Sequence, residues 1–284
     1  MIYQVTLSSV LALFPTWLAD LSGVLSQIFN GLAGHSKAFD KLISLPLENS
    51  LIKAAVIGAC FFAAWFGRQT PAETQKARKA LLITLIASVF VLATTKVVSH
   101  TVFLPRPFIQ SQKFYHLEGD RLIENKRIGY RVPLDYASQE NYENLLKGNI
   151  QTDDLGSFPS DHAGFFVAIS LGIWLASRSL GLISLGWTFL IVLLSKLVTG
   201  MHSPIDIAAG AGIAAVELSL CWYLGQRYLG GLLDKVSLWT LKNSALSSAF
   251  AFAVVFEISS TLTHLQPLLK LAASAGKHAF GIGS

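Results

Sequence analysis

The chain has 284 residues, of which 52% are hydrophobic and only 14% are charged. This composition excludes an ordinary soluble domain and is typical of an integral membrane protein. The net charge of +5 is explained by loop lysines and arginines at a membrane surface, and no basic tract interleaved with aromatics points to nucleic acid. Cys60 and Cys221 both lie in apolar runs, so neither a disulfide framework nor a metal-binding spacing is indicated.

The N-terminal region precedes the clear membrane spans. Residues 5–28 are apolar but interrupted by Pro15 and Asp20, so they form either a first span or a helix lying in the interface. Residues 28–46 place apolar positions among polar ones, which indicates an amphipathic surface helix.

Further apolar runs are each close to the roughly 20 residues that a helix needs to cross hydrocarbon. They are residues 51–67, 80–104, 161–177, 180–199, 205–224 and 244–263. We therefore predict an all-α fold, a polytopic transmembrane helical bundle with six core helices, or seven if the N-terminal run crosses. The predicted segments are 1–48 (interfacial or first span), 49–107 (spans), 108–158 (extramembrane loop or cap), 159–224 (spans) and 225–284 (last span and tail).

The connectors between the spans indicate an orientation. Residues 68–79 form a compact basic stretch, which we expect on the cytoplasmic side. Arg178 and Arg227 fall on that side if the spans alternate, although Lys37 and Lys41 fall on the other. The long connector 108–158 balances acids and bases and contains several tyrosines, which favours a small ordered cap over a linker.

Counting spans brings three polar stretches to one membrane face. Residues 104–108 end one span and residues 158–162 begin the next, so the two stretches share a face. Two spans separate His162 from His202, and the stretch 195–206 therefore returns to the same face. This convergence does not depend on which face is outside.

The stretch 195–206 contains a candidate nucleophile. Ser203-Pro204 is typical of a helix start, which places Asp206 at the third helical position, four residues after His202. A carboxylate there can accept a proton from one ring nitrogen of His202 and leave the other nucleophilic. The alternative is that Asp206 only caps free N–H groups of the helix.

The other residues of this face suit an anion. Arg106, Lys196 and Lys96 are cations, and the helix that begins at Ser160 offers free N–H groups. His162 supplies a proton donor beside the nucleophile. The combination predicts phosphoryl transfer through a phosphohistidine, without a metal or other cofactor. For Lys96, a buried structural ion pair is the alternative.

These stretches resemble the three motifs of the type-2 phosphatidic acid phosphatase superfamily, whose fold is shared with vanadium haloperoxidases. The resemblance covers roughly residues 28–224. The motifs Lys-x6-Arg-Pro, Pro-Ser-Gly-His and Ser-Arg-x5-His-x3-Asp are matched by Arg106 and Pro107, by residues 159–162, and by Ser195, Lys196, His202 and Asp206.

The resemblance implies a role for each matched residue. His202 would attack phosphorus, Asp206 would orient it, and His162 would protonate the leaving oxygen. The expected phosphate-binding residues are Arg106, Lys196, Lys96, Ser160 and Asp161.

Three positions depart from the family pattern. Lys196 replaces an arginine, which keeps the charge but loses the bidentate fork. Asp161 replaces a glycine and adds a negative charge, as in the undecaprenyl diphosphatase branch of the superfamily. The first-motif lysine is absent seven residues before Arg106, where Ser99 stands, and Lys96 lies about one helical turn deeper.

The resemblance implies an integral lipid phosphatase of the inner (plasma) membrane, with its active site on the non-cytoplasmic face. The expected substrate is undecaprenyl diphosphate, with phosphatidate, phosphatidylglycerol phosphate or a lipid A phosphate as alternatives. Because Lys196 and Asp161 depart from the pattern, a non-catalytic binding or transport protein with a degenerate site is the rival hypothesis. A haloperoxidase is disfavoured because those enzymes are soluble. The oligomeric state is not indicated.

Overall fold

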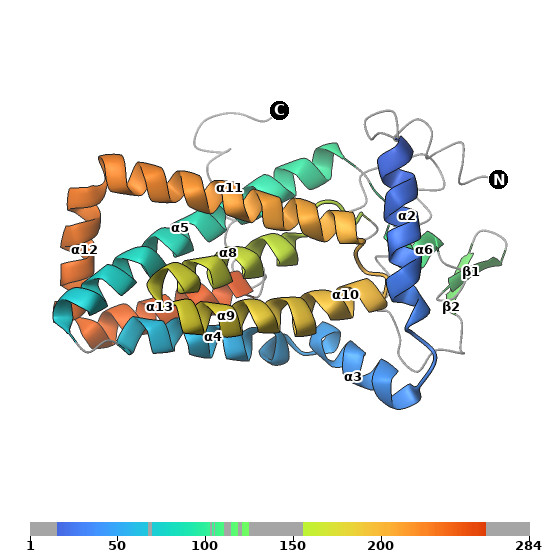
Figure 1. Ribbon diagram of the computed structural model, residues 1–284, viewed down its shortest axis with the longest axis horizontal. Coiled ribbons are helices and arrows are strands. Elements are labelled where there is room, and N and C mark those ends of the chain that lie inside the picture. The colour runs from blue at the N-terminus through green and yellow to red at the C-terminus, as the bar shows by residue number, and fades with distance from the viewer. Residues whose placement is uncertain are drawn as a thin grey trace, which may run out of the picture.

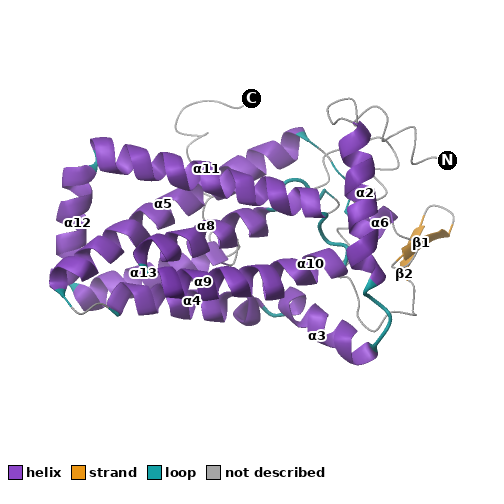
Figure 2. Ribbon diagram, in the orientation of Figure 1, coloured by secondary structure: helices purple, strands orange, loops and turns teal. Residues whose placement is uncertain are grey.

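The chain is described by a computed structural model at residues 16–67, 70–102, 104, 106–110, 115–118, 121–124 and 156–259. Within these residues the fold is helical apart from one antiparallel hairpin (Figure 2), formed by β1 (Tyr115–Glu118) and β2 (Arg121–Glu124). The predicted all-α class is therefore confirmed. Most of the predicted cap at 108–158 lies outside the described residues, as do residues 1–15 and the tail after Ser259.

The helices form an elongated bundle (Figure 1). Before the hairpin they are α2 (Thr16–Gly31), α3 (Lys37–Glu48), α4 (Ser50–Phe66), α5 (Pro71–Thr101) and α6 (Pro107–Gln110). After it they are α8 (Asp161–Ala176), α9 (Arg178–Trp187), the π-helical η2 (Thr188–Leu193), α10 (Leu194–Val198), α11 (Pro204–Tyr228), α12 (Gly230–Lys242) and α13 (Ser244–Ser259). In Figure 1, α2 and α12 lie across opposite ends of the bundle.

Helix length and composition support a membrane-spanning bundle. Among the described residues, three helices are long and apolar enough to cross a membrane: α5, the continuous α9–η2–α10 segment, and α11. The bent pair α3–α4 would make a fourth, and α8 and α13 are shorter apolar helices. The count of six spans stays a prediction.

Two helix starts agree with the sequence prediction, and one does not. Ser160 caps α8, and Ser203 and Asp206 form a capping box at the start of α11. In contrast, α5 begins at Pro71, well before the apolar run at 80–104, because Thr70 and Glu73 form another capping box. Most of the predicted basic loop 68–79 is therefore the first two turns of a helix.

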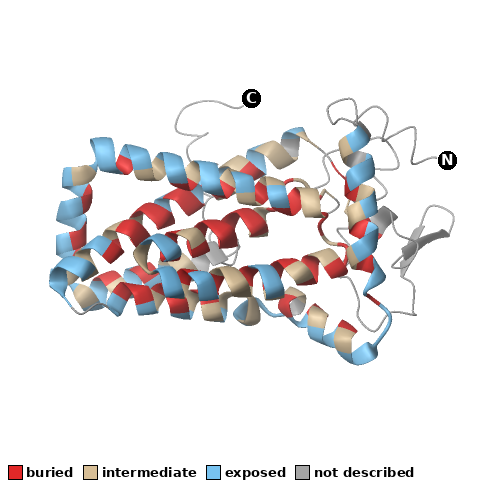
Figure 3. Cartoon of the chain, viewed as in Figure 1, coloured by how far each residue is buried: buried red, intermediate tan, exposed pale blue. Residues whose placement is uncertain are grey.

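Helix α8 is the centre of the bundle, and α5, α11, α9 and α4 pack around it. Figure 3 shows α8 buried along most of its length while the outer face of α11 is exposed. Glycines permit this packing: a Cβ at Gly172 would overlap Thr84, and a Cβ at Gly210 would overlap the Ser160 carbonyl. Small residues at helix contacts are the usual way in which membrane helices approach closely.

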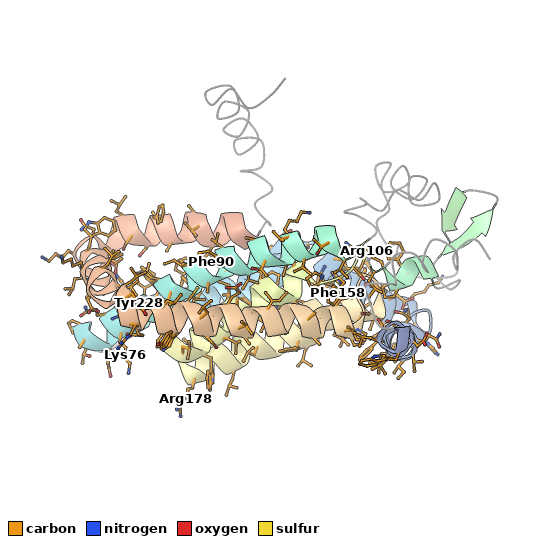
Figure 4. The ribbon with its side chains drawn as sticks, turned by 90° about the horizontal axis from the view of Figure 1, so that it is seen from above. Lys76, Phe90, Arg106, Phe158, Arg178 and Tyr228 are labelled. Atoms are coloured by element: carbon orange, nitrogen blue, oxygen red, sulfur yellow. The ribbon has the colours of Figure 1, made fainter. Side chains whose placement is uncertain are left out.

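The end of the bundle that carries Lys76 and Arg178 lies far from Arg106 (Figure 4). Arg78 is buried at this end, although the sequence placed it in a loop. Its guanidinium donates to the carbonyls of Trp65 (3.2 Å) and Thr240 (2.6 Å) and lies over the Trp65 ring. Arg78 thus connects α5 to the end of α4 and to α12.

Candidate active site

The three predicted stretches meet at the other end of the bundle. Figure 4 shows Arg106, after α5, and Phe158, before α8, at this shared end. The segment between α10 and α11 reaches it as well, because Arg106 Nη1 donates to the Met201 carbonyl at 3.0 Å. Between His162 and His202 the chain passes through α8 and then through the continuous α9–η2–α10 segment, which correspond to the two predicted runs.

Backbone hydrogen bonds connect the stretches in pairs. Ser157 N donates to the Leu104 carbonyl (2.8 Å), and Ser160 N donates to the Asp206 carbonyl (3.1 Å). Phe108 N donates to the carbonyl of Gly200 (2.9 Å), whose positive φ of 71° suits glycine. The relative positions of the three stretches are therefore defined by main-chain contacts and not by long side chains alone.

His202 is almost completely buried, with 4% of its surface exposed. Its Nδ1 lies 3.0 Å from the Ser157 carbonyl oxygen. Because a carbonyl only accepts hydrogen bonds, Nδ1 carries the proton and Nε2 keeps its lone pair. Burial lowers the pKa of His202 to about 4, and Lys196 and Arg106 act in the same direction while Asp206 opposes them. At neutral pH this histidine is therefore an uncharged potential nucleophile.

Asp206 is fully buried but is not the nearest acceptor of His202. Its Oδ2 lies 3.8 Å from His202 Nδ1, beyond hydrogen-bond distance, and accepts instead from Ser203 N at 2.6 Å. Its Oδ1 is buried and has no hydrogen-bond partner within the described part of the chain. Asp206 therefore caps the helix, as the alternative prediction has it, and places a negative charge near His202, whereas the predicted hydrogen bond from the ring goes to the Ser157 carbonyl instead.

The second histidine, His162, has a carboxylate of its own. Asp161 Oδ1 lies 2.7 Å from His162 Nδ1 and also accepts from the His162 backbone N–H at 2.7 Å. The sequence prediction assigned Asp161 to phosphate binding. The structure pairs its carboxylate with the imidazole next to it.

The predicted cations differ in their placement. Lys196 is buried and half-buried Arg106 lies at the same end, and both act electrostatically on His202. Lys96 is exposed on α5, in the turn before the last. Lys53 of α4, which the apolar run alone gave no reason to place in a site, interacts electrostatically with Lys196, Asp161 and His162.

Ser160 is fully buried at the start of α8. Its backbone N–H, which the sequence offered to a phosphate, donates to the Asp206 carbonyl instead. Its Oγ accepts from Ala163 N at 3.3 Å, so the hydroxyl hydrogen is the donor that remains for a ligand.

With this geometry described, comparison with known proteins identifies the family. A profile of the PAP2 superfamily matches residues 52–220. The chain belongs to the PAP2 superfamily. The matched region extends from α4 to α11 and includes all three motif stretches.

Individual relatives of this PAP2 chain are phosphatases by name. Over 136 residues it is 31% identical to phosphatidylglycerophosphatase B of Escherichia coli K12 and equally to those of Escherichia coli O157:H7 and Shigella flexneri. The alignments include 45% of this chain and 53% of each relative, so the chain spans about half the length of the curated relatives it matches. No solved structure gives a significant match.

Two residues of this PAP2 site were missed by sequence reasoning. Ser157 acts through its main-chain carbonyl, which every residue type has, so no side-chain pattern signals it. Lys53 is a single cation in an apolar run, where a lysine ordinarily extends its charged end to the interface. The signal in the sequence was the position of Lys53, one turn after the start of α4. Because α4 and α8 run in parallel, this position lies at the level where α8 begins.

Proposed function

We propose that this PAP2 protein is an integral membrane lipid phosphatase that hydrolyses a polyprenyl diphosphate, such as undecaprenyl diphosphate, through a phosphohistidine. The observation that carries the proposal is the buried, neutral His202 whose Nδ1 is held by a backbone carbonyl. His162, Arg106 and Lys196 from the other stretches lie at the same end of the bundle and supply the remaining groups that the reaction needs.

In the first step, Nε2 of His202 attacks phosphorus. The positive charge that develops on the ring is stabilised by the Asp206 carboxylate and by the Ser157 carbonyl. His162 donates a proton to the leaving oxygen as the P–O bond breaks. Arg106 and Lys196 offset the negative charge on the phosphoryl oxygens, with Lys96 and the hydroxyl of Ser160 as further ligands.

In the second step, water attacks the phosphohistidine. His162, neutral after its first proton transfer, accepts a proton from this water. The N–P bond breaks, inorganic phosphate leaves, and neutral His202 is restored. This scheme uses only groups of the protein and one water molecule, and it requires no metal ion.

The substrate proposal rests on the location of the site and on Asp161. A polar site at the end of an apolar bundle suits an amphiphile with a wet head group and a tail in lipid. Asp161 stands where the undecaprenyl diphosphatase branch has aspartate. Phosphatidylglycerol phosphate is the second candidate because the relatives are named for it. We propose an inner-membrane location with the site on the non-cytoplasmic face, opposite the basic end of the bundle.

The test is phosphate release by the detergent-solubilised protein from a panel of lipid phosphates, with and without a chelator. We expect the highest kcat/KM with the polyprenyl diphosphate, unchanged by the chelator, and no release by His202→Ala. Preference for phosphatidylglycerol phosphate would overturn the substrate but retain the class. Release that survives in His202→Ala would overturn the nucleophile, and no release from any substrate would favour a degenerate binding site.

A further inference from the structure

The contact between Asp161 and His162 is the strongest polar feature of the site that the reaction scheme leaves unused. One carboxylate oxygen, Oδ1, lies 2.7 Å from both the ring Nδ1 and the backbone N of His162. Both residues are partly exposed at the first turn of α8. The histidine ring is therefore held at Nδ1 by its own neighbour in the sequence.

A helix cap alone does not account for this contact. Acidic residues are common in first turns because they interact favourably with free N–H groups, and the bond to His162 N is of that kind. However, Ser160 already caps α8 through Ala163 N. The bond to Nδ1 contributes nothing to the helix end, and it determines the orientation of the imidazole.

The chemistry of the pair follows from its donor and acceptor roles. An ionised carboxylate only accepts, so Nδ1 carries a proton and Nε2 is the nitrogen that can exchange one. A carboxylate at this distance also favours the imidazolium form. This matters here because burial, Lys196 and Lys53 favour the neutral form of the same ring, and Asp161 opposes them.

We propose that Asp161 is a positioning residue for His162, which favours the imidazolium form and directs its Nε2–H at the leaving oxygen; this inference rests on the proposed function. When the His202 N–P bond forms and the P–O bond breaks, the Nε2 proton moves to the leaving oxygen. His162 becomes neutral, and its Nδ1–H remains hydrogen-bonded to the Asp161 carboxylate. The water of the second step returns a proton to Nε2.

Leaving groups of different basicity test this role. When its P–O bond breaks, an alkyl phosphate expels a strongly basic alkoxide that needs the proton, whereas p-nitrophenyl phosphate expels a stable phenolate that needs it little. Asp161→Asn keeps the acceptor oxygen but removes the charge. We expect this variant to lose kcat by about 10² with a lipid monophosphate, the low end of general acid catalysis, and by only a few-fold with p-nitrophenyl phosphate.

Further variants separate positioning from folding. Asp161→Gly should show the same difference between the two substrates, and His162→Ala should show it at least as strongly. Asp234→Asn, on an exposed aspartate of α12 that pairs with Lys79, is the matched control and should leave both rates unchanged. Thermal stability and vanadate inhibition report on fold and phosphate binding.

Each outcome decides between the two proposals. Equal losses of kcat on both substrates, or no loss on either, in active Asp161 variants would overturn the positioning role and leave the phosphatase proposal intact. A wild-type protein that releases phosphate from no member of the lipid phosphate panel and from neither of these two substrates would overturn the proposed function, and the inference with it. A loss confined to the alkyl phosphate supports both.

Discussion

At the scale of single residues, the orientation of His202 depends on the main chain. Its Nδ1 donates to the Ser157 carbonyl, while the Asp206 carboxylate that the spacing suggested is committed to Ser203 N. Spacing could predict that Asp206 lies beside His202, because a helix start places both. It could not predict how two donors compete for one carboxylate, since this depends on distances of a few tenths of an ångström.

The low pKa of His202 predicts the pH dependence of phosphorylation. The nucleophile loses its lone pair when it is protonated, and burial lowers its pKa from the usual value to about 4. We therefore expect the acid limb of kcat/KM, corrected for ionisation of the substrate, to lie near pH 4. A limb near the ordinary histidine value of about 6.5 would contradict a buried neutral His202.

The same shift predicts the pH dependence of stability. Between about pH 6.5 and 4 the unfolded chain binds a proton at His202 that the folded chain does not bind. The free energy of unfolding should therefore fall as the pH falls through this window. Denaturant titrations of the wild type and His202→Gln measure it, and the variant should show the smaller decrease.

Lys53 is predicted to contribute to anion binding. It interacts electrostatically with Lys196 and His162, so its removal should weaken inhibition by vanadate, an anion that mimics the reacting phosphoryl group. We expect about a tenfold loss of vanadate affinity in Lys53→Met, since a charge-assisted contact contributes about 1.5 kcal/mol. Lys76→Met, at the other end of the bundle, should be unchanged. Equal affinity in both variants would remove Lys53 from the site.

At the scale of helices, the starts that combine a capping residue with an apolar run were predictable, whereas helical turns made of polar and basic residues were not. Ser160 and Ser203 mark α8 and α11, so their first residues followed from local chemistry. The first turns of α5 are basic, and an apolar window excludes them even though Thr70 and Glu73 cap them. α12 lies between two predicted spans, in a stretch that is too polar for a span, so the sequence pattern predicts a connector there.

The contact between α8 and α11 predicts the effect of one methyl group. A Cβ at Gly210 would overlap the Ser160 carbonyl, whereas a Cβ at Gly212 on the same helix meets no atom within 4 Å. Gly210→Ala should lower stability by about 1–3 kcal/mol, as overpacking does, and should reduce activity by displacing Ser160 from Asp206. Gly212→Ala should be neutral or slightly stabilising. Thermal unfolding and phosphate release measure both effects, and similar values for the two variants would contradict this packing.

At the scale of the whole molecule, the bundle has two chemically different ends. One end holds the three motif stretches, and the other holds Lys76 and Arg178 (Figure 4). The sequence could predict this division because it requires only that spans alternate. It could not predict that α2 lies across the motif end of the bundle (Figure 1), which depends on packing against α10 and α11.

The two ends of α5 test the proposed orientation. Thr101 and Lys76 are both exposed and lie at opposite ends of this helix. In a background with Cys60 and Cys221 replaced by alanine, Thr101→Cys should react with a membrane-impermeant thiol reagent applied from the non-cytoplasmic side of intact cells. Lys76→Cys should react only after permeabilisation. The reverse pattern would place the active site in the cytoplasm.

The two hydrogen bonds from Ser157 to the Leu104 carbonyl have a consequence for the chain that lies between these residues. The backbone N and the Oγ of Ser157 both donate to one carbonyl oxygen that is 53 positions earlier in the chain. These two hydrogen bonds hold the chain together where it leaves the bundle after α5 and where it returns before α8. The connector between them can therefore lengthen or be exchanged at small entropic cost. A change in the length of this connector therefore need not disturb the alignment of the three motif stretches.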